Sequence, residues 1–345
     1  MAGADGAGGG AMSGRRWHPL EIGFWVAPPL AYFVFAGRRP FLSQIFVYGL
    51  FALSLDLILG YAGILSLGHA AFFGAGAYTA GLLARHGWTE PLSGLAAAGA
   101  VAAALGYVVG VLVVPGSDLA RLMVTLGIGF MMSEAANQAS SITGGVDGLS
   151  DMQPGKLLGA FPFALDGKTA AVYSFAVLFA TFVLARRVVH SPFGLALRGI
   201  RENARRMPAI GVDVDRRLRA VFSLAGGMAG LAGALLAQTT QFVGIDTLGF
   251  QRSADLLIML VLGGAGRLYG ALLGATVFIL AQDVLAGLSP AYWQFWLGAA
   301  LVSLVLIARG GGGGGGGGGS GGGGGLMGGL ERLARRVRRG TWPAR

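Results

Sequence analysis

The segment that decides the fold is an apolar run followed closely by a basic one. The first part reads TAAVYSFAVLFATFVLA at 169–185, and the second reads SPFGLALRGIRENARRMPAIGV at Ser191–Val212, with four arginines in its middle. The apolar part belongs to a predicted membrane span at 168–188. An arginine at the centre of a bilayer costs about 2.5–3.5 kcal/mol on translocon scales. The chain is therefore expected to leave the membrane between these two parts.

Composition extends this interpretation to the whole chain. Of the 345 residues, 54% are hydrophobic and only 12% are charged, and the mean hydropathy is +0.65. Soluble domains contain about 25% charged residues, so these values indicate a polytopic membrane protein. The absence of cysteine excludes disulfides, thiolate metal sites and thiol nucleophiles. We attribute the net charge of +10 to arginines on the cytoplasmic side of a membrane, rather than to nucleic-acid binding.

The predicted fold is all-α, a bundle of about ten membrane spans with a range of about eight to ten. The candidate spans are 20–36, 41–60, 63–84, 92–114, 119–139, 168–188, 218–238, 252–264, 268–285 and 291–308. Two of them differ from the rest, because 63–84 is rich in glycine and 252–264 is short. We expect the short one to be broken or re-entrant.

Orientation follows from the positions of the basic residues. If both termini are cytoplasmic, 20 of the 26 arginines and lysines lie on the cytoplasmic side. Basic residues are concentrated in cytoplasmic loops, so the sequence predicts an N-in, C-in topology. Arg38 and Arg39 are the visible exception, because they fall on the outer side.

Four regions are expected along the chain. Residues 1–18 are predicted to be a disordered cytoplasmic tail, and 19–309 the membrane domain, with a cytoplasmic coupling loop at 189–217. Glycine at the density found in 310–325 predicts a flexible linker. The basic segment 326–345 is a cytoplasmic tail, either an amphipathic helix on the anionic inner leaflet or a frayed end.

The basic stretch itself has the pattern of a short amphipathic helix of about four turns. Ser191 is a candidate N-cap, Pro192 suits the first helical position, and Pro208 should end the helix near Met207. The apolar face consists of Phe193, Leu197, Ile200 and Ala204. The basic face consists of Arg198, Arg201 and Arg205. Two interpretations remain compatible: the arginines hold the loop inside the cell, or the helix docks a soluble partner.

Several segments, in the same order, resemble LivM-type permease subunits of branched-chain amino-acid ABC importers. They are SPFGLALRGIRENARRMPAIGVDV at 191–214, LDLILGYAGILSLGHAAFFGAGAYTAGLLA at Leu55–Ala84, ITGGVDGLSDM at Ile142–Met152 and LVLGGAGRLYGALLGA at Leu260–Ala275. The resemblance covers about residues 40–310. Pro208 departs from the family, which usually has a small or acidic residue there. The glycine run also interrupts a tail that is less glycine-rich in relatives.

The resemblance implies a non-catalytic permease subunit of the bacterial inner membrane. Expected partners are two ABC ATPase subunits, a second homologous permease, a periplasmic substrate-binding protein and the lipid bilayer, without nucleic acid. ATP would be bound by the ATPase partners, so no cofactor, metal or catalytic residue is expected in this chain. The predicted ATPase-coupling residues are Phe193, Leu197, Arg198, Arg201, Glu202, Arg205 and Gly211.

Motif searches agree with this assignment. A phosphate-binding loop requires G-x-x-x-x-G-K-[ST], and the GKT at Gly167–Thr169 has Pro162 where the first glycine belongs. The glycine-rich GAGRLYG at 264–270 resembles a dinucleotide-binding pattern, but no strand precedes it. Close helix packing is the better interpretation of these glycines.

Polar residues inside apolar spans are candidates for lining a transport path, because burying them in lipid is costly. The candidates are Ser66, His69, Thr125 and Glu134. His69 is alternatively an ordinary interhelical hydrogen-bonding residue, and Asp56 is expected to pair with it or with a neighbouring helix. Asp147 and Gly148 are candidates for contact with an external binding protein, or else form a simple turn.

Three function classes were weighed. The first is the importer subunit for leucine, isoleucine or valine, or for urea, short amides or other amino acids. The second is a self-sufficient secondary transporter or channel, which predicts inverted repeats and several buried acids. The third is a membrane enzyme, which requires clustered histidines or acids that the sequence lacks.

Overall fold

A computed structural model describes residues 19–34, 36–150, 152, 155–157, 159, 161–163, 167–288, 290 and 292–310. The predicted N-terminal tail at 1–18, all but the first residue of the linker at 310–325 and the C-terminal tail at 326–345 lie outside the described residues.

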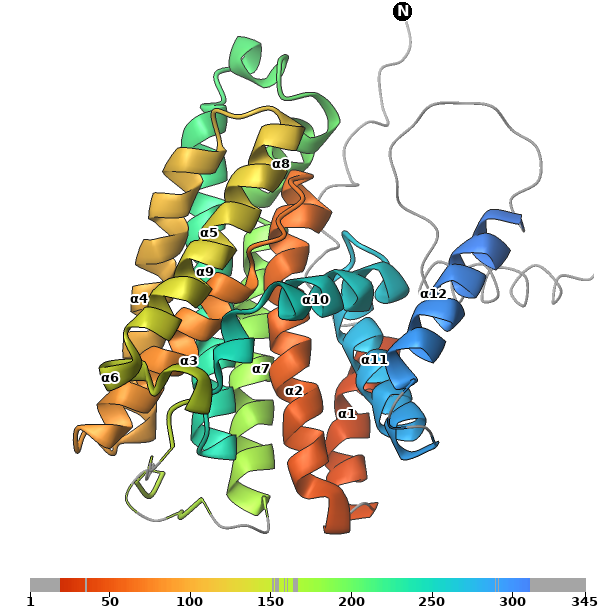
Figure 1. Ribbon diagram of the computed structural model, residues 1–345. Helices are drawn as coiled ribbons and strands as arrows, with labels where there is room; N and C mark the ends of the chain where they lie inside the picture. The colour runs from red at the N-terminus through yellow and green to blue at the C-terminus, as the bar shows by residue number, and fades with distance from the viewer. Residues whose placement is uncertain are drawn as a thin grey trace, which may run out of the picture.

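The described residues form a bundle of helices joined by short connections, which confirms the all-α prediction (Figure 1). The α-helices are α1 (Pro19–Val34), α2 (Arg39–Leu55), α3 (Ala70–Arg85), α4 (Pro91–Val113), α5 (Asp118–Gln138), α6 (Ser140–Thr143), α7 (Lys168–Val189), α8 (Pro192–Asn203), α9 (Val214–Thr240), α10 (Phe250–Gly263), α11 (Leu268–Leu288) and α12 (Trp293–Gly310). The short helical segments are η2 (Ala36–Arg38), η3 (Asp56–Ala62), η4 (Gly145–Asp147), η5 (Met207–Ile210) and η6 (Ile245–Leu248).

Each predicted span overlaps one of these helices, but the helices differ in length. Among the described residues, six helices are long and apolar enough to cross a membrane. They are Arg39–Ala62, Pro91–Val113, Asp118–Gln138, Lys168–Val189, Val214–Thr240 and Leu268–Leu288. The remaining predicted spans correspond to helices that are shorter, or whose described part does not meet both conditions.

The centre of the bundle is the continuous helix formed by α2 and η3, where η3 is a π-helical turn. In its most apolar stretch 89% of the residues are buried. It contacts α7, α9, α10 and α11, and its side chains Leu50, Phe51 and Leu53 are fully buried. A helix that is apolar on all sides is expected at such a central position.

The predicted span 63–84 is wrong as a single helix. The chain leaves η3 at Gly63, which has a φ of +75°, and runs without regular structure until α3 begins at Ala70. Glycine adopts this left-handed conformation without the steric cost that a Cβ brings. Irregular backbone at membrane depth is tolerated where protein surrounds it, and Ile64, Ser66 and His69 are all buried. Ser66 therefore lies on the break and not on α3.

The short helix α10 lies across the bundle, whereas α2 and α7 run along it (Figure 1). Its 14 residues extend about 21 Å, which is less than a hydrocarbon core of about 30 Å. The expectation of a short segment at 252–264 agrees with this geometry, but the segment is not broken, because α10 is continuous from Phe250 to Gly263. Gly263 of α10 and Gly270 of α11 bring the two backbones so close that a Cβ on Gly263 would collide with the Gly270 carbonyl. The GAGRLYG glycines thus lie in a closely packed helical hairpin, as expected.

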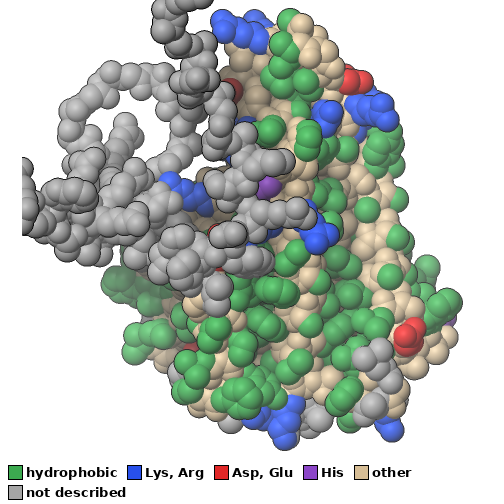
Figure 2. All heavy atoms as spheres, turned by 180° about the vertical axis from the view of Figure 1, so that it is seen from behind, with side chains coloured by type: hydrophobic (Ala, Val, Ile, Leu, Met, Phe, Trp, Pro, Cys, Tyr) green, Lys and Arg blue, Asp and Glu red, His purple; other side chains and the backbone are tan. Residues whose placement is uncertain are grey.

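The outer surface of the bundle is largely apolar. Figure 2 shows hydrophobic side chains over much of the side of the molecule, with charged side chains gathered mainly toward its upper and lower ends. Large apolar residues such as Leu112, Met123 and Met131 are exposed on the described surface. Such a surface is unfavourable in water and favourable in lipid.

Candidate functional site

The predicted coupling helix exists and is shorter than expected. It is α8, which begins at Pro192 and ends at Asn203, so it has about three turns rather than four. The chain then turns through residues 204–206 into η5 and reaches Gly211, which has a φ of +80°. Pro208 lies inside η5, and α8 ends five residues before it, at Asn203. Arg205 and Arg206 therefore lie outside the helix.

The start of α8 confirms one prediction and corrects another. Pro192 occupies the first turn, as expected. The Ser191 hydroxyl makes no cap to α8, because it donates instead to the Val188 carbonyl at 2.6 Å. Ser191 therefore ties α8 to the last turn of α7 and fixes the angle between them.

One side of α8 is packed into the bundle. Leu197 is completely buried and Ile200 is 4% exposed, and both lie in the hydrophobic core. Phe193 is half-buried, and the Arg217 guanidinium of α9 lies 5.6 Å from its ring centre. Ala204 is exposed, so the predicted apolar face ends at Ile200.

The other side of α8 is open. Leu195 is 62% exposed, and Glu202 and Arg205 are exposed beside it. Ile210 of η5 is 72% exposed. Sequence reasoning missed Leu195 and Ile210 because apolar residues at helical spacing were assigned to the buried face. Leu195 could have been recognised as exposed, because it does not fall at the helical spacing of Phe193, Leu197 and Ile200.

Arg201 is not a free surface cation. Its guanidinium donates a hydrogen bond from Nη1 to the Gly60 carbonyl in η3, and its side-chain stem lies against Gly63. The neighbouring Arg198 guanidinium lies 5.3 Å from the ring centre of Tyr61, also in η3. Two arginines of α8 therefore contact the C-terminal end of the central helix, at its π-helical turn.

Asp56 completes this connection from the inside. Its carboxylate Oδ1 accepts a hydrogen bond of 2.6 Å from the Gly266 N–H, in the turn between α10 and α11. Asp56 is completely buried and lies within the electrostatic reach of Arg201. We call the set Asp56, Gly60, Arg201 and Gly266 the polar clamp. It joins α8, η3 and the α10–α11 turn, so Asp56 pairs with a neighbouring segment and not with His69.

His69 lies at the start of α3 and is completely buried. Its Nε2 is 2.9 Å from the Ser54 hydroxyl oxygen, and its ring stacks on Phe51 at 5.8 Å. The single hydroxyl proton of Ser54 is donated to the Phe51 carbonyl at 2.6 Å. His69 therefore donates from Nε2. Because the ring is completely buried and its one hydrogen-bond partner is the uncharged Ser54, the ring is neutral and its Nδ1 is a bare acceptor. No described residue pairs with that Nδ1.

The break between η3 and α3 is held by two other hydroxyls. Thr125 of α5 accepts a hydrogen bond of 3.3 Å from the Leu67 N–H, and Ser253 of α10 accepts one of 3.0 Å from the Ala70 N–H. Ser66 is 1% exposed, and its hydroxyl has no partner among the described residues. The structure thus brings Ser66, His69 and Thr125 together at one buried break, which we call the central break.

Glu134 lies elsewhere. It is exposed on α5, and its carboxylate accepts a hydrogen bond of 2.7 Å from Gln138 on the same helix. In the most apolar stretch of α5 only 11% of residues are buried, so one side of this helix is open. Glu134 is on α5 but is not buried in the bundle.

The two outer-loop candidates have different surroundings. Asp147 is exposed at the end of η4. Gly148 is buried, with a φ of +75°, and a Cβ there would meet the Val243 carbonyl at 2.8 Å. The next residue, Leu149, exchanges backbone hydrogen bonds with Val243. Gly148 thus fixes a loop-to-loop contact, and Asp147 is the member that faces outward.

The described residues contain no group of three or more histidines and acids placed to hold a metal ion. Asp56 and Arg201 of the clamp are hydrogen-bonded to backbone of other elements, and so are Thr125 and Ser253 at the central break. This arrangement can hold helix ends together.

Comparisons with known proteins agree with this geometry. The family model described as "Branched-chain amino acid transport system / permease component" matches residues 39–308. The chain is 27% identical, over 304 residues, to the high-affinity branched-chain amino acid transport system permease protein LivM of Salmonella typhimurium, covering 81% of this chain and 71% of that protein. It is 28% identical over 283 residues to LivM of Escherichia coli, covering 75% and 66%.

A second group of relatives carries the name LivH. The LivH permease protein of Escherichia coli is 24% identical over 290 residues, covering 77% of this chain and 93% of that protein. The alignments span about two thirds of the length of the two LivM relatives. No solved structure matches the chain.

The family match covers well over half of the chain, including the central helix, the central break and α8. Together with six helices able to cross a membrane, it makes the chain a multi-pass protein of the inner membrane. The chain belongs to the branched-chain amino acid transport system permease component family.

Proposed function

We propose that this chain is a permease subunit of an ATP-driven importer that moves branched-chain amino acids across the inner membrane. The observation that carries the proposal is α8, a short amphipathic helix anchored in the central helix on one side and open on the other. The family match over 39–308 and the names of the LivM and LivH relatives support the cargo. The chain itself binds no nucleotide in this proposal, and ATP is hydrolysed by partner subunits.

The proposed topology has both termini inside, with about ten membrane segments when the shorter helices are counted. In Figure 1, α8 lies at the upper end of the bundle, and the segment between α6 and α7 lies at the lower end. In the proposed topology the basic α8 segment lies in the cytoplasm and Asp147 lies outside. The arginine distribution supports the same arrangement.

In this proposal the open side of α8 receives force from the ATPase pair. Leu195 and Ile210 supply apolar contacts, and Glu202 and Arg205 supply charges for specificity. The polar clamp carries movement of α8 to η3 and to the α10–α11 turn. Because η3 leads directly into the central break, a shift of α8 changes the position of Ser66 and His69.

In this proposal the exposed face of α5 is the contact surface for the second permease subunit. A carboxylate such as Glu134 is costly to expose to lipid, so its face of α5 should meet protein or a wet path. The path then runs between the two permeases and passes the central break, where Thr125 of α5 contacts Leu67. Asp147, at the opposite end from α8, is the proposed contact for a periplasmic binding protein.

Reconstitution tests the function class. Liposomes that contain this chain, a LivH-type permease and their ATPases should accumulate labelled leucine when ATP and the binding protein are present. Liposomes with the chain alone should show no uptake under proton or sodium gradients. Gradient-driven uptake by the chain alone would establish a secondary transporter instead, and uptake of labelled urea in place of leucine would change the cargo.

Substitutions on the open side of α8 test the docking. Leu195→Asp is expected to reduce co-purification of the ATPase subunits by about tenfold, because it places a charge in an apolar contact. Val146→Asp is the control, since Val146 is a similarly exposed apolar residue in η4, outside α8 and outside the predicted spans. Equal co-purification from Leu195→Asp and wild type would disprove docking through this face.

Single cysteines test the topology directly, because the chain contains no cysteine. Ile210→Cys and Val146→Cys place thiols at positions that are 72% and 79% exposed. A membrane-impermeant maleimide applied to intact spheroplasts should label Val146→Cys and spare Ile210→Cys. The reverse pattern would overturn the proposed orientation.

A further inference from the structure

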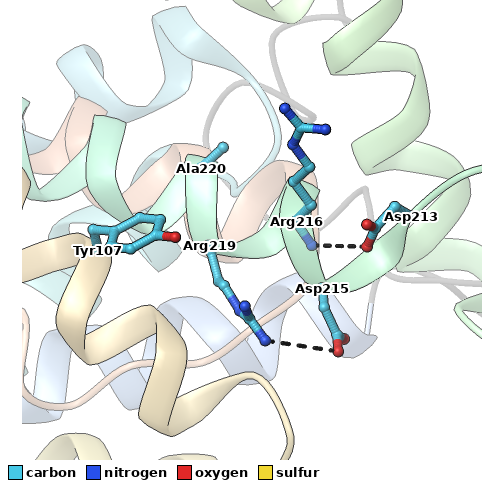
Figure 3. Close-up of a pocket in the computed structure, with 6 residues that line it drawn as sticks. All are labelled: Tyr107, Asp213, Asp215, Arg216, Arg219 and Ala220. Atoms are coloured by element: carbon cyan, nitrogen blue, oxygen red, sulfur yellow. Dashed lines mark hydrogen bonds and ion pairs between the residues drawn. The ribbon is translucent and has the colours of Figure 1, made fainter.

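The arginine–aspartate pairs of the described residues differ in how their side chains are arranged. In the hollow between α4 and α9, Arg219 and Asp215 are 4.0 Å apart, and the guanidiniums of Arg216 and Arg219 point in opposite directions (Figure 3). The side chains of that hollow do not converge on one point. The pair Arg252–Asp246 is different, because further polar groups from other elements meet it.

Arg252, in the first turn of α10, contacts side chains of two other elements. Its Nη1 donates a hydrogen bond of 2.5 Å to the Tyr48 hydroxyl of α2, and its Nη2 donates to the Asp246 carboxylate of η6. Asp255, one turn further along α10, accepts a hydrogen bond of 3.0 Å from Gln251 and lies within the electrostatic reach of Arg252. We call Tyr48, Asp246, Arg252 and Asp255 the arginine cluster.

The arginine cluster reaches from the interior of the bundle to its surface. Tyr48 is 4% exposed, whereas the side chains of Arg252 and Asp246 are 30% and 59% exposed. Tyr78 of α3 is also buried, and its hydroxyl lies within the electrostatic reach of Asp246 but has no hydrogen-bond partner among the described residues. A buried hydroxyl without a partner is costly, so it indicates a group that a ligand can satisfy.

The arginine cluster is continuous with the central break. Arg252 is followed directly by Ser253, whose hydroxyl holds the start of α3. The ring of Tyr48 stacks on Phe73 at 6.3 Å, and Phe73 stacks on Phe51 at 4.4 Å. Phe51 is the ring on which the histidine of the break stacks. A row of aromatic rings therefore leads from the cluster to the break.

On its other side the cluster borders the loops at the η4 end of the bundle. Val243, shortly before η6, exchanges backbone hydrogen bonds with Leu149, which follows η4. The segment from Val243 to Arg252 thus connects those loops to α10. In the proposed topology this is the outer end, so the cluster lies between the outer loops and the central break.

The charges of the pair restrict what can bind there. An uncharged ligand that separates Arg252 from Asp246 leaves two charges without partners, which is costly at a partly buried site. A simple carboxylate satisfies only Arg252, and a simple amine satisfies only Asp246. A molecule with a carboxylate and an ammonium group on one carbon exchanges one ion pair for two and leaves no charge without a partner.

We propose that the arginine cluster binds the charged groups of a zwitterionic α-amino acid, with Arg252 on the carboxylate and Asp246 on the ammonium group. The hydroxyls of Tyr48 and Tyr78 supply further hydrogen bonds. Binding exchanges the Arg252–Asp246 pair for two ion pairs with the ligand. This inference rests on the proposed function and narrows its cargo, because urea and short amides lack both charges.

Thermal stabilisation of the purified full chain in nanodiscs by ligands tests the proposal. Leucine, isocaproate and isoamylamine share one apolar group and carry both charges, only the carboxylate and only the ammonium, respectively. We expect leucine to bind about tenfold more tightly than either analogue. No binding of leucine, or binding of either analogue as tightly as leucine, would overturn the proposal.

Variants assign the two charges. Asp246→Asn removes the partner of the ammonium group and the internal competitor of the ligand carboxylate, so isocaproate should bind this variant as tightly as leucine does. A merely structural role of Asp246 would weaken both ligands together. Arg252→Gln should weaken leucine binding by about tenfold. Asp283→Asn is the control, because it removes the acid of the exposed Arg38–Asp283 pair, outside the cluster, and should bind as wild type.

Thermal unfolding of each variant without ligand checks folding. If folded Asp246→Asn kept the wild-type preference for leucine over isocaproate, the assignment of Asp246 would be wrong and the site disproved. The uptake assay separates this failure from failure of the proposed function. Leucine uptake by the complete complex without the expected binding to this chain would leave the proposed function intact, whereas uptake of urea in place of leucine would contradict both.

Discussion

The polar clamp and the central break hold the same helix in two different ways. The clamp uses charged groups, Asp56 and Arg201, that reach backbone in two other elements. The central break uses neutral groups, Ser54, His69 and Thr125, and leaves polar atoms without partners. The clamp lies beside α8, and the break lies among α2, α3, α5 and α10.

This difference indicates that the clamp and the central break differ in stiffness. Hydrogen bonds to charged groups are worth about twice as much as neutral ones, so the clamp is the stiffer connection. Buried polar atoms without partners carry a desolvation cost, so the central break is the weaker point. A push on α8 is therefore expected to move the clamp as a unit and to open the structure at the break.

The largest expected effect comes from removing the buried acid of the clamp. Asp56→Ala leaves the Gly266 N–H buried without an acceptor and should lower the free energy of unfolding by about 1–3 kcal/mol. ATP-driven uptake should fall much more than ATP hydrolysis. Thermal unfolding and uptake per ATP in proteoliposomes measure both effects. Asp56→Asn keeps an acceptor for the Gly266 N–H and should lose less stability and less uptake than Asp56→Ala. If Asp56→Ala had the stability and the uptake per ATP of wild type, the clamp would have no part in the mechanism.

A second substitution disrupts the polar clamp at Gly266. Gly266 has a φ of +82°, and a Cβ there lies 3.0 Å from the Gly60 carbonyl oxygen and 3.1 Å from Arg201 Nη1. Gly266→Ala should cost about 1–2 kcal/mol for the left-handed backbone, plus the loss of the clamp geometry. Gly87→Ala is the matched control, because φ is +88° and no atom lies within 4 Å of its added Cβ. Equal loss of uptake in both variants would mean that only backbone strain matters.

A third substitution tests the central break. Ser54→Ala removes the oxygen that accepts from His69 and leaves the buried Nε2–H without a partner. We expect the free energy of unfolding to fall by about 1–2 kcal/mol. Uptake and ATP hydrolysis should slow by the same factor, so that the amount of leucine taken up per ATP hydrolysed is unchanged. Parallel assays of uptake and hydrolysis distinguish this from Asp56→Ala. A drop in uptake per ATP would show that the break also transmits force.

The smallest expected effect is that of Ser66→Ala. The Ser66 hydroxyl is buried without a partner among the described residues, so removing it should change the unfolding free energy by less than about 0.5 kcal/mol. If the path passes this hydroxyl, the concentration of leucine at half-maximal uptake should change while stability does not. Unchanged transport kinetics would exclude Ser66 from the path.

Several parts of the site were readable in the sequence because they depend on local pattern. Pro192 and the spacing of Leu197 and Ile200 predicted where α8 begins and which side it buries. The length of 252–264 predicted a segment too short to cross the membrane. The match of residues 39–308 to the permease family confirms what the quoted segments resembled.

Other parts depended on contacts between distant residues. The helix expected over 63–84 begins only at Ala70, because Thr125 and Ser253 bind the backbone N–H groups of the preceding segment. Arg201 resembles its exposed neighbours in sequence, yet it is turned inward by a carbonyl 141 positions away. Propensity and periodicity carry no information about such partners.

The sequence by itself determined that this chain is a helical membrane protein, where most of its helices lie and which family it belongs to. These properties follow from hydrophobic length, charge distribution and motifs, which are local in the chain. Only the tertiary structure decided which polar groups meet: Asp56 with Gly266, His69 with Ser54, and Arg201 with Gly60. Buried polar groups must find partners, and the partner is chosen by packing in three dimensions.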